Sequence, residues 1–200
     1  MKNLNTYITE KFLINKNTSI PIYNYYPKTK NELKKLVDKL IKERGYDANL
    51  NDIDTSEITD MSELLMYSEF NGDISEWNVS NVVNMQSMFY RSMFNGDISK
   101  WDVSNVTNMY CMFESSNFNK DISKWNVSNV KDTSYMFCNS SFNKDISKWD
   151  VSNVKSMKYM FQNSNFNGDI SNWNTNNVIY MNIMFNDSPL EKNPPKWYKK

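Results

Sequence analysis

The sequence is dominated by a short motif, Asp-Ile-Ser-x-Trp, that returns at a fixed interval of 24 residues. A unit of this length cannot bury an apolar face by itself, so successive copies must stack and share one continuous core. Stacked repeats present long surfaces instead of one convergent site, so we expect binding more than catalysis. The five copies begin at Asp73, Asp97, Asp121, Asp145 and Asp169.

Within one repeat, the apolar residues change their spacing. Trp101 and Val103 alternate around Asp102, which is typical of a short strand. The next apolar positions are spaced as on a helix, and Asn108 lies where an N-cap is expected. We therefore predict an α/β repeat fold, a right-handed solenoid with one short strand and one short helical turn in each 24-residue repeat. The residues with helical spacing are Val106, Met109, Met112 and Phe113.

The pattern divides the chain into three parts. Residues 1–46 are expected to form an N-terminal arm, with a loose hairpin or irregular structure over 1–28, followed by a capping helix. Residues 47–188 contain one degenerate and five regular repeats, and form the solenoid. Residues 189–200 carry three prolines, which remove backbone donors and end the array as a C-terminal cap.

The predicted N-terminal helix has clear boundaries. Thr29 and Glu32 make a capping box, and Gly45 follows the last basic residue. A basic amphipathic helix can dock on a membrane surface or on a partner. We favour a cap over the first repeat, because the helix directly precedes the repeats and repeat proteins need such caps. The apolar stripe consists of Leu33, Leu36, Val37, Leu40 and Ile41.

The formal charge of the chain is zero, but it is unevenly distributed. Residues 1–46 carry ten bases and four acids, whereas residues 47–114 carry two bases and twelve acids. The opposite charges predict weak attraction between the two regions, within one molecule or between molecules. The chain lacks the continuous basic stripe that nucleic acids require, so we expect no nucleic-acid partner.

Two cysteines and the N-terminal sequence bear on the compartment. Cys111 and Cys138 lie 27 residues apart without CxxC spacing, so we expect free, buried thiols and no disulfide or metal site. The first residues contain no apolar signal-peptide core, and no segment is long and apolar enough for a membrane span. We therefore expect no export signal in this chain.

The repeat consensus, FN-x-DIS-x-W-x-VSNV-x-x-M-x-x-MF, resembles the BspA-like leucine-rich-repeat surface proteins of bacteria. The resemblance covers about residues 28–198. It implies a leucine-rich-repeat-like solenoid that is displayed on the cell surface or secreted, with a role in adhesion and host contact. It implies no catalytic activity. One departure concerns the asparagine of the repeat, because Asn105 follows Ile98 by seven residues where the ordinary pattern has eight.

Stacking turns each repeat position into a column of like residues. An exposed aromatic column could bind sugars, but the tryptophans recur beside valine and isoleucine, which favours a core. The aspartates of the Asp-Ile-Ser-x-Trp motif form a column of like charges that must be compensated. They could bind a cation such as calcium, or each could cap its own turn by accepting backbone N–H groups, the interpretation that we favour.

Two columns on the expected outer strand face are our candidates for ligand contact. Their charges vary from repeat to repeat, as on a binding surface. Ordinary pairing between neighbouring repeats for solubility would give the same pattern, and the sequence does not separate the two alternatives. The candidate residues are Glu76, Lys100, Lys124, Lys148 and Asn172, and their neighbours Asn78, Asp102, Asn126, Asp150 and Asn174.

These features predict a non-enzymatic protein–protein interaction module. We expect an adhesin-like bacterial surface protein whose partner is a protein, such as a host surface or matrix protein. The alternative is an intracellular scaffold or self-assembling repeat protein, favoured by the absent signal and the charge asymmetry. An enzyme is not expected, because the chain has no histidine and its acids recur in every repeat instead of converging. We predict no catalytic, metal-binding or cofactor-binding residues and no cofactor.

Overall fold

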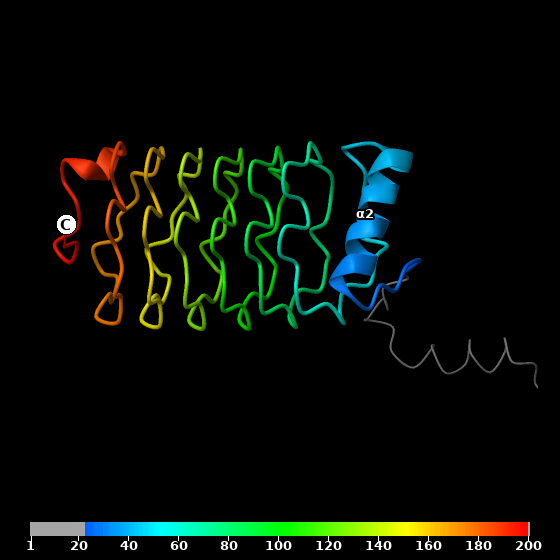
Figure 1. Cartoon of the computed structure of the whole chain (residues 1–200), viewed down its shortest axis with the longest axis horizontal. Helices are drawn as coiled ribbons and strands as arrows, with labels where there is room; N and C mark the ends of the chain where they lie inside the picture. Colours follow the sequence, from blue (N-terminus) through cyan, green and yellow to red (C-terminus); the bar gives the residue numbers. More distant parts are fainter. Residues whose placement is uncertain (1–22, 200) are drawn as a thin grey trace, which may run out of the picture.

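The computed structural model describes residues 23–199 as an elongated stack of coils, with α2 at one end and the C-terminal segment at the other (Figure 1). Each coil is one 24-residue repeat, so residues 24 apart in sequence are neighbours along the stack. Within residues 23–199 the helices are α2 (Lys30–Arg44) and the short 3-10 helix η1 (Pro189–Glu191).

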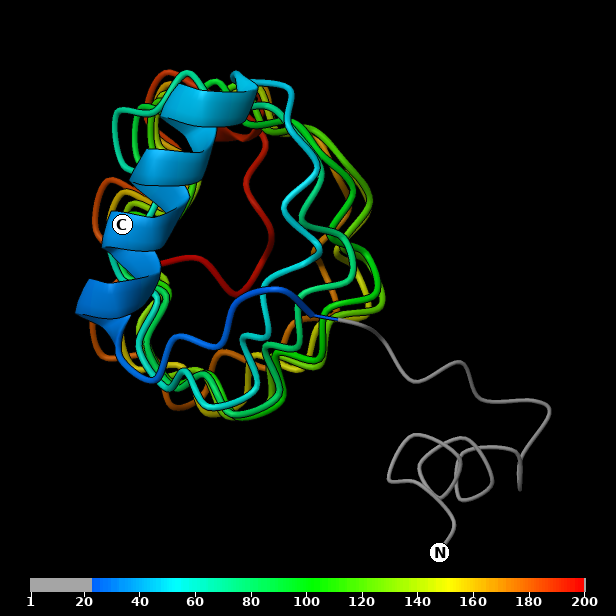
Figure 2. The same ribbon diagram turned by 90° about the vertical axis from the view of Figure 1, so that its right-hand side faces the viewer.

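The predicted N-terminal helix is present as α2. Thr29 Oγ1 accepts the Glu32 N–H at 3.2 Å, and the Gly45 N–H donates to Ile41 O at 2.8 Å. In the end-on view, α2 lies across one wall of the stack, over its N-terminal end (Figure 2). The side chains that α2 buries are Leu33, Val37 and Leu40.

The arm expected over residues 1–28 lies outside the described residues except for residues 23–28. In this part, Tyr25 forms a parallel bridge with Ile53 of the first coil. The Asp54 N–H donates to Tyr25 O at 2.9 Å. Together with α2, this pairing covers the N-terminal end of the stack.

Neighbouring coils are joined by isolated parallel bridges and not by a sheet. No strand forms within residues 23–199, and one column carries a single bridge from each coil to the next. The predicted α/β fold, a leucine-rich-repeat-like right-handed solenoid with one short strand and one short helical turn per repeat, is therefore wrong. The bridged column consists of Asp60, Asn84, Asn108, Asp132, Ser156 and Tyr180.

The residues with helical spacing lie on consecutive β-turns. The Met88 N–H donates to Met85 O at 3.2 Å, and the Ser92 N–H donates to Phe89 O at 3.1 Å. The N–H groups of Met85 and Phe89 donate instead to carbonyls of the next coil, both at 3.0 Å. A helix would direct each N–H to the fourth residue before it. The turns therefore bury the same methionines and phenylalanine without a helix.

These turns require two residues with left-handed backbone in each coil. In one coil they are Cys111 and Ser115, with φ values of 54° and 55°. This conformation costs a residue with a side chain about 1–2 kcal/mol. Both N–H groups donate to carbonyls of the next coil, at 2.9 and 2.8 Å, which offsets the cost. Asn108 Oδ1 accepts the Tyr110 N–H at 3.0 Å, so it begins these turns and does not cap a helix.

The residues expected on a strand join the coils through side chains. The backbone N–H of Trp101 donates to Ile98 O of its own coil at 3.2 Å, so it forms no hydrogen bond between coils. Its indole Nε1–H donates to Ile74 O of the preceding coil at 3.2 Å. Asn105 Nδ2 donates to Ser80 O of the preceding coil at 2.7 Å. The same bonds recur along the stack as a tryptophan ladder and an asparagine ladder.

Aromatic columns fill the interior of the stack. Trp125 is 4% exposed, and the buried rings of Phe113 and Phe137 stack with their centroids 5.7 Å apart. The core interpretation of these columns is confirmed, and the tryptophans do not form a sugar-binding stripe on the surface. The buried columns include Trp77, Trp101, Trp125, Trp149 and Trp173, then Phe89, Phe113, Phe137, Phe161 and Phe185.

At the C-terminal end the tail folds back over the core. Trp197 stacks 6.2 Å from Trp173 and donates its indole N–H to Ile170 O at 2.9 Å. Tyr198 meets the Phe185 ring edge-on at 4.9 Å. This segment crosses the far end of the coil in the end-on view (Figure 2). The domain boundaries proposed from the sequence stay predictions.

Both cysteines are free and buried, as their spacing predicted. Within residues 23–199, no helix combines the length and the hydropathy needed to cross a membrane.

Candidate functional site

The ten residues predicted to contact a ligand are all exposed, but they lie on turns and not on a strand face. Lys100 Nζ and Glu76 Oε1 pair across neighbouring coils at 3.3 Å. Asp102 Oδ1 accepts the Ser104 N–H at 3.1 Å, and the other members of its column hold their own turns in the same way. The role of these residues in ligand contact stays a prediction. The two columns are Glu76, Lys100, Lys124, Lys148 and Asn172, and Asn78, Asp102, Asn126, Asp150 and Asn174.

The aspartate column caps its own turns. Asp121 Oδ1 accepts the Ser123 N–H at 2.8 Å, and this bond holds the pKa of Asp121 below its usual value. The turn-capping interpretation is confirmed in each coil. Within residues 23–199 no three His, Cys, Asp or Glu side chains are placed to hold a metal ion together. The other aspartates with the same bond and a lowered pKa are Asp73, Asp97, Asp145 and Asp169.

A different surface is formed by the outward side chains of the consecutive turns, which we call the turn face. Its residues change from coil to coil, whereas the Asp-Ile-Ser-x-Trp wall repeats almost unchanged. One of its columns, for example, reads Tyr67, Arg91, Ser115, Asn139, Asn163 and Asp187. The segments of the turn face are 59–67, 83–91, 107–115, 131–139, 155–163 and 179–187.

Tyrosines gather on the turn face. The rings of Tyr67 and Tyr90 meet edge-on at 5.3 Å, and those of Tyr135 and Tyr159 stack at 4.5 Å. Burial raises the pKa of Tyr90 and of Tyr135, so both phenols stay protonated at neutral pH. Each tyrosine therefore offers an apolar ring together with a hydroxyl that can donate or accept a hydrogen bond.

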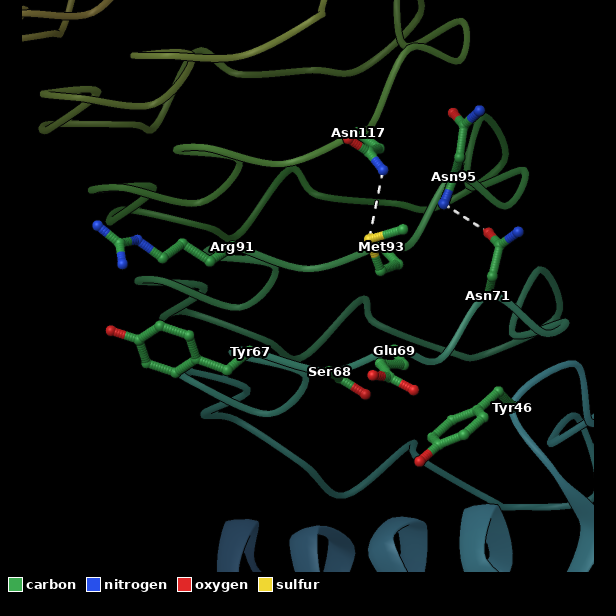
Figure 3. Close-up of a pocket in the computed structure, with 9 residues that line it drawn as sticks. All are labelled: Tyr46, Tyr67, Ser68, Glu69, Asn71, Arg91, Met93, Asn95 and Asn117. Carbon is green, nitrogen blue, oxygen red and sulfur yellow. Dashed lines mark hydrogen bonds between the residues drawn. The ribbon is translucent and has the colours of Figure 1, made fainter.

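The turn face borders a groove of about 670 Å³ near α2. Tyr46 comes from the segment after α2, Tyr67 and Glu69 from the first coil, and Arg91 and Met93 from the second (Figure 3). The exposed fractions of Tyr46, Tyr67 and Met93 are 54%, 59% and 53%. A cluster of large apolar side chains exposed to this degree is characteristic of a contact surface.

Backbone and side-chain bonds fix the floor of the groove. Asn95 N–H donates to Asn71 Oδ1 at 2.7 Å, and Asn117 Nδ2 lies 3.4 Å from Met93 Sδ (Figure 3). The Met93 N–H donates to Ser68 O of the preceding coil at 2.9 Å. The groove therefore belongs to the rigid ladder of the stack.

Arg91 is the main cation of the groove. Its guanidinium carbon lies 5.9 Å from the Tyr67 ring centroid and 5.4 Å from that of Tyr90. Stacking on these rings orients the guanidinium and leaves its N–H groups available. Among the ion pairs formed by residues 23–199, none involves Arg91 or Glu69. Both charges are therefore available to a ligand.

The two cysteines, which lie on the consecutive turns but are buried beneath the turn face, are poor nucleophiles. Burial raises the pKa of the Cys138 thiol to about 11, and burial also raises the pKa of Cys111. The thiolate is the reactive form of cysteine. Both thiols are therefore protonated at neutral pH, and the arrangement supports binding more than covalent chemistry.

Neither the groove nor the tyrosines were predicted from the sequence. The predicted helical turn ended at the column of Phe113, before the columns of Tyr90 and Arg91, and the ligand was placed on the Glu76 and Asn78 columns. A signal was present in the repeats themselves. The positions between the conserved methionines and phenylalanines vary most among the coils, as the change from Tyr67 to Arg91 and Ser115 illustrates.

Comparison with known proteins gives a family but no function. No curated protein and no solved structure matches the chain. One family model matches twice, over residues 32–141 and 114–198, and together the two matches include α2 from Glu32 onward and all the coils. The chain therefore belongs to the family described as "Mycoplasma protein of unknown function, DUF285".

Proposed function

We propose that the protein is a non-enzymatic module that binds a polypeptide in the groove formed by Tyr46, Tyr67, Glu69, Arg91 and Met93. One observation carries this proposal. The groove brings together exposed tyrosine, arginine and methionine side chains, the types that are enriched at protein interfaces and, for tyrosine and arginine, at their energetic hot spots.

The rigidity of the groove supports binding. Tyr67 N–H donates to Tyr90 O at 2.8 Å, and Arg91 N–H donates to the next coil at 2.9 Å. Both residues have left-handed backbone, with φ values of 57° and 50°. Because the coil already fixes the backbone of both residues, binding a partner does not require the chain to be ordered there, which lowers the entropic cost.

The charges of the groove indicate the chemistry of the partner. A carboxylate can pair with the stacked Arg91 guanidinium, and a lysine or arginine can pair with Glu69. An apolar or aromatic side chain between these charges would cover Tyr67 and Met93. The partner is therefore a polypeptide segment with an apolar residue flanked by one acidic and one basic residue.

Replacing Tyr67 and Arg91 together by asparagine is expected to weaken binding at least about tenfold while the fold is retained, since tenfold is about 1.4 kcal/mol of binding free energy. Asn139 and Asn163 already occupy the same column with left-handed backbone, at φ values of 54° and 49°. Asparagine therefore suits this position. The measurement is a selection of random displayed peptides on the immobilised protein, followed by calorimetric titration of the selected peptides.

The matched control is Ser115→Asn, which introduces the same residue in the same column outside the groove. Peptides with the predicted charges that bind the wild-type protein and the Ser115→Asn variant, but not the double variant, support the groove. If no peptide is selected, or if the double variant binds as well as the wild type, the groove is not a polypeptide site.

We further propose that the protein acts at the bacterial surface in host contact, as the resemblance to BspA-like repeat proteins suggests. Protease treatment of intact producing cells is expected to cleave the chain, with an antibody against the stack as the probe. A cytoplasmic protein of the same cells is the control for lysis. If the chain is protected from the protease until the cells are lysed, the surface role is contradicted. This outcome does not bear on the groove proposal.

A further inference from the structure

The bridge between the last two coils shows how neighbouring coils are hydrogen-bonded to each other. Ile179 N–H donates to Lys155 O at 2.9 Å, and Met157 N–H donates to Tyr180 O at 2.7 Å. The Tyr180 N–H also donates to Lys155 O, at 3.2 Å, and together with the Met157 bond it defines the parallel bridge between Ser156 and Tyr180. The same pair of bonds joins the earlier coils. At this bridge each coil offers one carbonyl and one N–H, two residues apart, to its successor, and further N–H groups of its turns donate to the successor as well.

On the last coil the equivalent groups are Ile179 O and the Met181 N–H. Among the hydrogen bonds formed by residues 23–199, neither group has a partner. Both belong to the C-terminal edge of the stack, where residues 189–199 cross the core but form no backbone bond with either group. An unpaired donor and acceptor side by side at such an edge can template pairing with another chain.

We propose that this edge, residues 178–183, pairs with the same edge of a second copy of the protein. In an antiparallel bridge centred on Tyr180, the Met181 N–H of each copy donates to Ile179 O of the other. This is the ordinary bonding of an antiparallel pair. A donor and an acceptor that flank one residue are self-complementary about a twofold axis, as an isologous dimer requires.

The side chains at this edge support the pairing. Ile179 and Tyr180 are 68% and 52% exposed, and Ile179 is the most exposed large apolar side chain among the described residues. They border a hollow of about 270 Å³ that also includes Val178 and Lys199. Pairing would remove both apolar side chains from water.

The opposite end of the stack explains why the assembly stops at two copies. There α2 covers the first coil, and Tyr25 already pairs with Ile53. A head-to-tail contact through the backbone would require displacement of these residues. The twofold contact uses the C-terminal edge of both copies, so it closes after one step.

The charges distinguish this contact from simple attraction between the ends. Lys158 Nζ lies 4.4 Å from the Tyr180 ring centroid, and Lys199 lines the same hollow. In a twofold contact each of these lysines approaches the same lysine of the other copy. This like-charge contact is repulsive, so screening by salt does not weaken the dimer. A contact between the basic C-terminal end and the acidic early coils would be lost as salt screens it.

Disulfide trapping of Tyr180→Cys tests the geometry. In an antiparallel pair without mutual hydrogen bonds, the two Cα atoms are about 4.5 Å apart, within the range of about 4.4–6.8 Å that a disulfide spans. Mild oxidation is expected to convert most of this variant into a covalent dimer. The control is Ser156→Cys, which has the same column position inside the stack. A Tyr180→Cys protein that stays monomeric, or a Ser156→Cys protein that dimerises equally, overturns the proposal.

Ile179→Lys tests the surface without introducing a thiol. Lys131 and Lys155 occupy the same column in earlier coils, so lysine fits the fold at this position. Sedimentation equilibrium is expected to show a dissociation constant raised at least about tenfold. The control, Val83→Lys, places lysine in the same column away from the edge and is expected to dimerise like the wild type.

The wild-type dimer is expected to persist at about 1 M salt, where the screening length falls to about 3 Å. Dissociation under that condition identifies a charge-driven contact and overturns the twofold pairing. A wild-type protein that is monomeric at all concentrations does so as well. These outcomes are independent of the polypeptide groove, whose residues lie at the other end of the stack.

Discussion

Replacing Trp125 by alanine is expected to lower the free energy of unfolding by about 3–5 kcal/mol, the usual cost of removing a large buried aromatic side chain. Trp125 is 4% exposed, and its ring lies 6.3 Å from that of Phe113. Its indole N–H also donates to Ile98 O of the preceding coil at 3.1 Å. The substitution therefore leaves a cavity and removes one of the two N–H donors to the Ile98 carbonyl, which keeps its bond from the Trp101 N–H.

Urea titration, followed by the fluorescence of the remaining tryptophans, measures this loss. The matched variant is Trp125→Phe, which keeps an aromatic ring but removes the indole N–H, and it is expected to lose less than the alanine variant. A loss below about 1 kcal/mol for Trp125→Ala would show that the ring is not a core residue. It would also reopen the interpretation of the tryptophans as an exposed sugar-binding stripe.

The stacking of the repeats and the position of the core followed from the sequence, because both depend on periodicity. A 24-residue interval places Trp101 next to Trp125, whatever local structure the backbone adopts between them. The turn-capping role of Asp121 and the boundaries of α2 also followed. These features depend on a side chain and the backbone within a few residues of it.

The local backbone structure of the repeat was predicted wrongly, for a physical reason. Met109, Met112 and Phe113 have a spacing that suits one face of a helix, but a series of β-turns buries the same positions. A helix of this length would leave its first four N–H groups without an internal partner. In the stack, the next coil offers carbonyls to every second N–H, at 2.8–3.0 Å for Met109, Cys111, Phe113 and Ser115. This alternative is invisible in the sequence of one repeat.

The candidate site was missed for a related reason. The strand prediction directed attention to Lys100 and Asp102 as outward residues, and both are indeed exposed. The predicted helical turn ended at Phe113, so the column shared by Tyr67 and Arg91, two positions further along the repeat, was not considered. Only the left-handed backbone at these positions, with φ values of 57° and 50°, places the two residues at the groove. A residue's left-handed conformation is set by the stack and not by its own preference.

Gly72→Ala is expected to destabilise the protein by about 3 kcal/mol, at the upper end of the cost of overpacking a core. A Cβ atom at Gly72 would lie 2.0 Å from Ala48 O and 2.8 Å from Ala48 N. These are backbone atoms of the preceding coil, and Ala48 O also accepts the Asp73 N–H at 3.0 Å. Relief of the clash therefore requires the two coils to separate and the bond between them to lengthen.

Gly168→Ala provides the matched comparison and is expected to cost less than about 1 kcal/mol, because the obstacle there is a movable side chain. A Cβ atom at Gly168 would lie 2.7 Å from the edge of the Phe166 ring, with no backbone atom among its nearest contacts. Lys120 and Lys144 occupy the same column in the middle coils, so the repeat accepts a side chain there. Urea titration of both variants measures the difference. Equal losses would mean that the contact between the first two coils is no tighter than the contacts between the later ones, since only a close backbone approach at Gly72 separates the two substitutions.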